Sequence, residues 1–339
     1  MSFRAATAAL LLLAIAGCSR EPEMLGQGDL AFDRDALTAQ FRAVEIAAAP
    51  AVLGVAVQDL SSGQIIAYNG DRPFPMQSVF KAPLAAAALA QIESGRLSAE
   101  EIIEIRDIDL SPPRSAIAEA WPKRARYTLG ELIERAVVDS DNTAADAVMK
   151  RIGGPGVVTS WLEGKKVKGV SVDRYERQLQ PEIDGLASFR SAWKGQAAYD
   201  TAVAAVPPAT ARAAASAYLA DRRDTATPIG AVRFLEALAQ NELLSPAYSR
   251  RLNALMTRSS TGLARLAAAT PPGGTLAHKA GTGRTAFGVN PATNDIGLYT
   301  LKDGRRIAVT VFLTGSTQDA AAREAVIAEV GGIVVAAAR

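Results

Sequence analysis

The residues PMQSVFKAPLAAAALA, numbers 75–90, predict a helix that is buried on every side. Alanine and leucine fill almost every position after Lys81, and a helix without a polar face has to be surrounded by the rest of the protein. Two polar residues, Ser78 and Lys81, stand where this helix begins. They are either a nucleophile and its activator or two polar side chains on the first turn of a core helix.

The place of Ser78 at the start of the helix favours the catalytic alternative. Its backbone N–H would lie at the positive end of the helix dipole, which can stabilise the negative oxygen of a tetrahedral intermediate. One turn of helix puts Lys81 on the same face, and a neutral lysine there could take the hydroxyl proton. A second Ser-x-x-Lys match at residues 191–194 lacks these flanking residues.

Segments near both ends of the chain predict strands of one antiparallel sheet. A β-hairpin is predicted around Ser61-Ser62-Gly63, and three further strands near the C-terminus, with Asp303-Gly304 as the turn between the last two. Helices are predicted at residues 31–49 and 318–338, and nearly every segment between about 77 and 266 has a helical pattern. The apolar positions of the first helix are Leu37, Phe41, Val44 and Ile46.

This order predicts an α/β fold in two parts, with an antiparallel five-stranded sheet flanked by the N- and C-terminal helices and a helical domain beside it. Residues 30–71 and 273–339 would form the α/β subdomain, and residues 72–272 the helical subdomain. We expect the active site in the cleft between the two.

Composition excludes several classes of partner. The 339 residues carry a formal net charge of +2 without a basic stripe, so nucleic acid is not expected as a partner. One histidine and one cysteine cannot build the usual zinc site, so we expect no metal and no cofactor.

The N-terminus predicts export. Residues 1–18 combine Arg4 with an apolar run too short to span a bilayer, and they end in Ile15-Ala16-Gly17-Cys18, which resembles a bacterial lipobox. Cys18 would then carry a lipid that holds the protein at a membrane on its periplasmic side, and residues 19–29 would be a tether. The alternative is a fully cleaved secretory signal with an incidental cysteine.

Two later motifs have ordinary explanations when each is taken alone. Ser140-Asp141-Asn142 precedes an apolar helix, which is typical of an N-cap, and Lys279 could be a solvated charge on an edge strand. Ser-x-x-Lys, Ser-Asp-Asn and Lys-x-Gly in this order are the motif set of class A β-lactamases and penicillin-binding proteins. Over residues 31–339 the chain resembles a class A serine β-lactamase of the penicillin-binding protein and serine transpeptidase superfamily.

The resemblance implies a role for each matching residue. Ser78 would attack the lactam carbonyl, with the N–H groups of Ser78 and Thr282 as oxyanion hole. Ser140, held near Lys81 and Lys279, would pass a proton to the departing ring nitrogen. The residues expected to bind substrate are Asn142, Gln180, Arg265, Lys279, Gly281 and Thr282.

Glu176, in VDRYERQLQ, resembles the general base that activates water to hydrolyse the acyl-enzyme. Gln180 stands where the family usually has asparagine. Whether Lys81 or Glu176 activates Ser78 stays open. The resemblance therefore implies an exported, monomeric enzyme that hydrolyses penicillins or cephalosporins and confers antibiotic resistance.

The main departure is an insertion in the omega loop, at about residues 181–222, with alanine-rich halves around Pro207-Pro208 that predict two short helices. Arg174 and Asp224 would still close the loop as a buried ion pair. The helices either reshape the mouth of the cleft or are a neutral surface addition.

Two other functions compete with β-lactam hydrolysis. A D,D-peptidase of the penicillin-binding type shares the first motifs but normally lacks the equivalent of Glu176. A penicillin sensor would be acylated and remain so.

Overall fold

A five-stranded antiparallel sheet forms the centre of the computed structural model, which describes residues 32–338. Its strand order is β2-β1-β9-β8-β7, so strands from the two ends of the chain pair side by side, with Val55 of β1 opposite Val311 of β9. The strands are β1 (Val52–Asp59), β2 (Ile65–Tyr68), β7 (Thr275–Thr282), β8 (Thr293–Thr300) and β9 (Arg306–Thr314). The cysteine at position 18 and the predicted tether lie outside the described residues.

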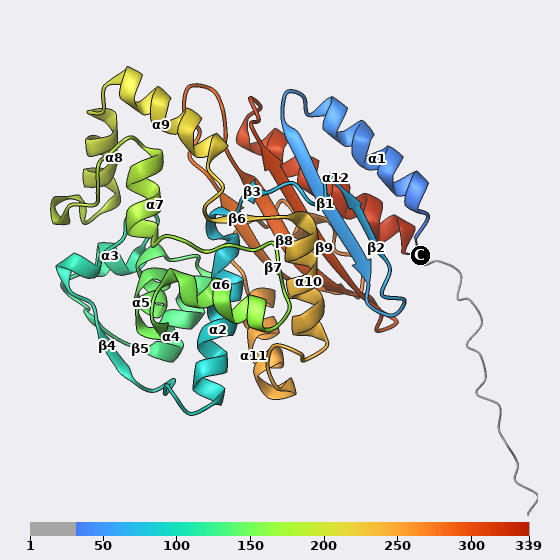
Figure 1. The fold of residues 1–339 in the computed structure, drawn as a ribbon, viewed down its shortest axis with the longest axis horizontal. Coiled ribbons are helices and arrows are strands. Elements are labelled where there is room, and N and C mark those ends of the chain that lie inside the picture. Colours follow the sequence, from blue (N-terminus) through green and yellow to red (C-terminus); the bar gives the residue numbers. More distant parts are fainter. Residues whose placement is uncertain (1–31, 339) are drawn as a thin grey trace, which may run out of the picture.

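The sheet separates two hydrophobic cores (Figure 1). Helices α1 (Arg34–Ala47) and α12 (Ala320–Ala337) cover one face, where Leu53, Val55 and Val57 of β1 point toward them. The other face meets the helical part through small residues of β1. A Cβ atom on Gly54 would lie 2.3 Å from the Phe74 ring, so only glycine permits this close packing.

The apolar positions of the first helix do not all lie in the core. Leu37, Phe41 and Val44 are buried, but Ile46 is 70% exposed. Two residues along a helix correspond to a rotation of about 200°, so Ile46 cannot share the face of Val44.

The alanine-rich helix α2 (Lys81–Glu93) lies at the centre of the helical part, and every residue from Lys81 to Leu89 is buried. Its small side chains let neighbouring helices approach closely. The helices packed against it are α4 (Leu129–Val138), α5 (Asn142–Ile152), α6 (Pro155–Gly164) and α11 (Pro246–Thr257). The helical part also contains α3 (Ala116–Ala120), α7 (Glu176–Ile183) and α10 (Pro228–Ala239). A two-stranded ribbon, β4 (Ile102–Glu104) with β5 (Arg126–Thr128), lies at the edge.

The insertion forms two helices, α8 (Gln196–Ala204) and α9 (Pro208–Ala220), as its sequence predicts. They stand beside α7 at one end of the helical part (Figure 1).

Within the described part of the chain, no helix is both long and apolar enough to cross a membrane.

The two ends of the enlarged omega loop are held together by the ion pair of Arg174 with Asp224, which we call the neck. Arg174 Nε donates to Asp224 Oδ2 at 2.6 Å, and both side chains are buried. Directly after Asp224, β6 (Thr225–Ala226) pairs with β3 (Phe74–Pro75), the strand that leads into Ser78. The far end of the insertion is therefore fastened to the strand that leads to this serine.

Removing one member of this buried pair should destabilise the protein strongly. Arg174→Ala leaves the Asp224 carboxylate without its partner, which costs on the order of 3 kcal/mol of unfolding free energy. Arg223 offers a matched control, since it is half-exposed and pairs with Glu182 and Asp221 of the same loop. We expect Arg223→Ala to cost less than about 1 kcal/mol in urea unfolding. Equal losses for the two variants would contradict this account of the neck.

Candidate active site

Ser78 lies in a single 3-10 turn, Gln77–Phe80, that leads directly into α2. The residue before it, Gln77, has a φ of 47°, a left-handed conformation that is uncommon for a residue with a side chain. Ser78 lines a small cleft of about 100 Å³ together with Asn142, Gln180 and Thr282.

Gly281 brings β7 against this turn. A Cβ atom at position 281 would lie 2.4 Å from the carbonyl oxygen of Met76, so any other residue would push the strand away. Thr282, the next residue, consequently borders the same cleft as Ser78. Ser78 and Thr282, which lie far apart in the sequence, therefore border the same cleft.

Lys81 is completely buried and contacts three other parts of the chain. Its Nζ donates to the carbonyl oxygen of Ser140 at 2.7 Å and to Asn142 Oδ1 at 2.5 Å. Glu176 Oε1 lies 3.2 Å away. Asn142 in turn donates from Nδ2 to the carbonyl of Pro113, so its amide orientation is fixed at both ends.

Ser140 joins the second lysine to this group. Lys279 Nζ donates to Ser140 Oγ at 3.0 Å and to the carbonyl of Ala280 at 3.0 Å. Burial, reinforced by the nearby charge of Lys81, lowers the pKa of Lys279 well below its usual value. A lysine that gives up its proton readily suits a relay through the Ser140 hydroxyl.

Glu176 begins helix α7 and is only 1% exposed. Its Oε2 accepts a hydrogen bond from Gln180 Nε2 at 2.8 Å. Its Oε1 makes an ion pair with Lys81 but is misaligned for a hydrogen bond with any atom of residues 32–338. One carboxylate oxygen thus keeps acceptor capacity for a proton.

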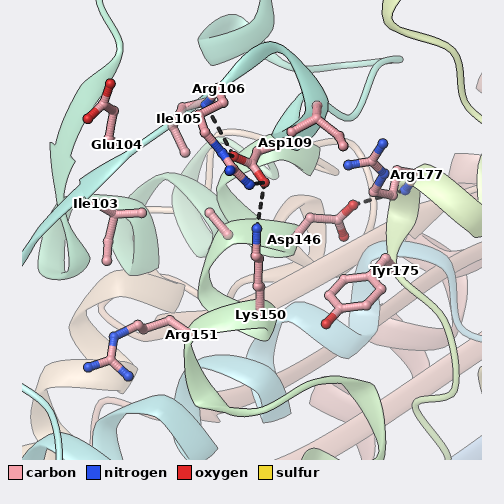
Figure 2. Close-up of a pocket in the computed structure, with 12 residues that line it drawn as sticks. Ile103, Glu104, Ile105, Arg106, Asp109, Asp146, Lys150, Arg151, Tyr175 and Arg177 are labelled. Carbon is pink, nitrogen blue, oxygen red and sulfur yellow. Dashed lines mark hydrogen bonds and ion pairs between the residues drawn. The ribbon is translucent and has the colours of Figure 1, made fainter.

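Asp146 holds the backbone at Glu176 in place. Its carboxylate accepts from the N–H groups of Glu176 and Arg177 and from Ser111 Oγ, at 2.7, 2.9 and 2.6 Å. Figure 2 shows this carboxylate at the edge of a separate pocket of about 600 Å³, which opens beside Tyr175 and the Lys150–Asp109 ion pair. Neither Ser78 nor Glu176 lines this larger pocket.

Arg265 lies beneath β7, outside the residues that line the cleft. Its guanidinium donates to the carbonyls of Gly281 and Asn294 and to Thr282 Oγ1, the last at 2.6 Å. It therefore acts on the cleft through Thr282. Two arginines that sequence reasoning missed, Arg114 and Arg284, do line the cleft.

The insertion supplies part of the cleft wall. Gln196 of α8 lines it and accepts from the Arg114 backbone N–H at 2.9 Å. Asp200, also on α8, forms an ion pair with Arg284, which lines the cleft as well. The insertion therefore contacts both of the arginines that border the cleft.

Residues 36–338 match the model of the family described as the beta-lactamase enzyme family. The chain belongs to this family. It is 30% identical to the beta-lactamase VEB-1 of Pseudomonas aeruginosa over 284 residues, which cover 83% of each protein. It is 28% identical to the extended-spectrum beta-lactamase PER-1 of the same species, across 83% of this chain and 80% of that protein.

Solved structures lead to the same family. A beta-lactamase from Chitinophaga pinensis superposes with a TM-score of 0.74 at 28% identity, covering 90% of this chain and all of the other. An ancestral class A beta-lactamase superposes with a TM-score of 0.71 at 34% identity, covering 89% and 99%. The predicted family, fold class and enzyme class are confirmed, and this β-lactamase is a hydrolase acting on the amide bond of the β-lactam ring.

Some of the missed residues had a signal in the sequence. Asp146 follows Asn142 by one helical turn, a spacing that predicts a shared helix face. Tyr199 and Tyr218 are large aromatic residues within alanine-rich helices, and both are buried. Arg114 and Arg284 stand in loops, where no periodicity reveals which way a side chain points.

The Asp146 carboxylate predicts a distinct pH dependence of stability. Burial raises its pKa to about 7, outweighing its three hydrogen bonds, and the nearby Glu176 adds to the rise. The folded protein therefore binds a proton that the unfolded chain releases between about pH 4 and pH 7, and this contribution to stability falls as pH rises through that window. We expect Asp146→Asn to gain unfolding free energy relative to wild type as pH rises from 4 to 7.

Urea unfolding at a series of pH values measures this difference. Glu242→Gln, which alters an exposed carboxylate far from the cleft, should keep the wild-type pH profile. An unchanged profile for Asp146→Asn would show that the buried carboxylate does not titrate as argued.

Proposed function

We propose that this β-lactamase opens penicillins and cephalosporins through an acyl-enzyme on Ser78. The observation that carries the proposal is the contact of Glu176 with both Lys81 and Gln180, the latter a residue that lines the cleft with Ser78. A buried carboxylate held in this way suits a general base for water.

In the acylation step, Ser78 Oγ bonds to the lactam carbonyl carbon and loses its proton to Lys81 or Glu176. The N–H groups of Ser78 and Thr282 stabilise the oxyanion. The carbon–nitrogen bond of the ring then breaks, and Ser140 passes a proton to the departing nitrogen, replenished from the lysines beside it. Lys279 and Thr282, the latter fixed by Arg265, bind the substrate carboxylate.

In the deacylation step, Glu176 takes a proton from water as the water oxygen attacks the ester carbonyl. The bond to Ser78 Oγ breaks, and the proton returns to the serine. The sum of both steps is the addition of one water across the lactam amide, and free Ser78 is regenerated. A D,D-peptidase or a penicillin sensor would not need Glu176 in this place.

Glu176→Gln tests whether Glu176 is the general base of the deacylation step. Loss of the general base should slow turnover of benzylpenicillin about a thousandfold, and the acyl adduct should accumulate on Ser78. Mass spectrometry of the intact protein detects the adduct, and turnover is followed by absorbance. Glu182→Gln, a half-exposed carboxylate in the same helix, should retain turnover without a lasting adduct.

The outcomes separate the competing functions. Stoichiometric binding without turnover by the unmutated protein would indicate a penicillin-binding peptidase or a sensor. Normal turnover by Glu176→Gln would remove Glu176 from the mechanism.

We also propose that the insertion selects among substrates, because Gln196 lines the cleft and Asp200 forms an ion pair with Arg284, which lines it as well. Asp200→Ala should release Arg284 and raise kcat/KM several-fold for a cephalosporin with a bulky acyl group, relative to benzylpenicillin. Thr201→Ala, on the same helix but bonded only to Ala197 within it, should leave the ratio unchanged. An identical ratio in Asp200→Ala would support the neutral alternative.

The position in the cell follows from the N-terminal sequence. We propose export, lipidation of Cys18, and a monomer held on the periplasmic side of a membrane, with residues 30–71 and 273–339 as one subdomain and 72–272 as the other. Labelling with a radioactive fatty acid should mark the wild type and not Cys18→Ser.

A further inference from the structure

Tyr218, on helix α9 of the insertion, reaches the residue beside the nucleophile. Its side chain is 4% exposed, and its hydroxyl oxygen accepts a hydrogen bond from Gln77 Nε2 at 2.6 Å. These two residues lie 141 positions apart in the sequence. The contact is therefore made by tertiary packing of the insertion against the catalytic turn.

The hydrogen bond continues through two amides to Glu176. Gln77 Oε1 accepts from Gln180 Nε2 at 3.2 Å, and the same Nε2 donates to Glu176 Oε2 at 2.8 Å. Because an ionised carboxylate only accepts, Gln180 has to present its nitrogen, and Gln77 then has to present its oxygen. The Gln77 nitrogen is left pointing at Tyr218, which supplies the acceptor.

Gln77 borders the cleft but is only 2% exposed, so little solvent is present to replace that acceptor. A buried amide nitrogen that loses its partner is unfavourable, so the side chain would rotate to find another. Rotation would break the contact with Gln180 and free the amide that holds Glu176. It would also loosen the backbone at Gln77, whose left-handed conformation lies directly before Ser78.

The insertion holds the tyrosine firmly. Tyr218 packs against Leu179 and Ile183 of α7 in a small core of its own. Burial raises the pKa of the phenol, so it stays protonated and serves as a hydrogen-bond partner rather than as a base.

We propose that Tyr218 is a positioning residue for deacylation, which fixes the Gln77 and Gln180 amides and through them the carboxylate of Glu176. The inference rests on the proposed function and goes beyond it, because it gives the insertion a part in turnover in addition to substrate selection.

Tyr218→Phe tests the inference, because it keeps the aromatic ring and removes only the acceptor. We expect the deacylation rate constant to fall about five- to tenfold, as for the loss of one hydrogen bond, and the acylation rate constant to stay within twofold of wild type. Rapid-quench mass spectrometry with benzylpenicillin measures both constants. Where deacylation limits turnover, kcat and KM should fall together while kcat/KM stays constant.

Ile183→Val is the matched control. It loosens the same small core without touching the hydrogen bonds, so it should lower stability while the deacylation constant stays at the wild-type value. A deacylation defect in Ile183→Val equal to that of Tyr218→Phe would assign the effect to packing alone and overturn the proposal.

A second variant tests the same link from its other end. Gln77→Met should show the deacylation defect, and adding Tyr218→Phe to it should cause no further slowing. If the Tyr218→Phe variant does not fold, the deacylation rate constant of Gln77→Met still tests the link between Tyr218 and Glu176. Wild-type turnover with unaltered deacylation in Tyr218→Phe would overturn this inference only, whereas absence of wild-type turnover would overturn the proposed function.

Discussion

The side chain of Lys81 is fully buried, and the arrangement of the site depends on giving its Nζ polar partners. A buried polar group is tolerated only where it is hydrogen-bonded. The loop before α5 supplies the carbonyl of Ser140, α5 supplies Asn142, and α7 supplies Glu176. The requirement of one side chain thus gathers three segments around the start of α2, beside the serine.

A second constraint acts through the backbone. The strand β7 approaches the turn at Ser78 as closely as it does only because position 281 has no side chain, and Arg265 donates hydrogen bonds to Gly281 and Thr282 at the end of that strand. The sheet contributes Lys279 and Thr282, and the helical part contributes Ser78, Ser140 and Glu176. The candidate site therefore lies where the two parts meet.

The family motifs allowed most of this site to be predicted from sequence. Their order singled out Ser78, Lys81, Ser140, Glu176 and Lys279 as candidates, and the strand and helix patterns predicted the sheet built from both chain ends. The helical spacing of apolar residues did not show that Ile46 lies off the buried face. It also could not show that Arg114 and Arg284 line the cleft, because the direction of a side chain in a loop depends on the geometry of that loop. The contact of Tyr218 with Gln77 was beyond sequence reasoning, because it depends on how α9 packs against α7 rather than on any local pattern.

The neck formed by Arg174 and Asp224 gives the omega loop a fixed base, while the segment between them can lengthen at little entropic cost. Such a base would let evolution exchange whole loop segments without disturbing the nucleophile. In this protein the exchange is no longer free, because the inserted segment contacts both the mouth of the cleft and the side chain next to Ser78. Substitutions in the inserted segment are therefore constrained at two places at once, the mouth of the cleft and the residue next to Ser78.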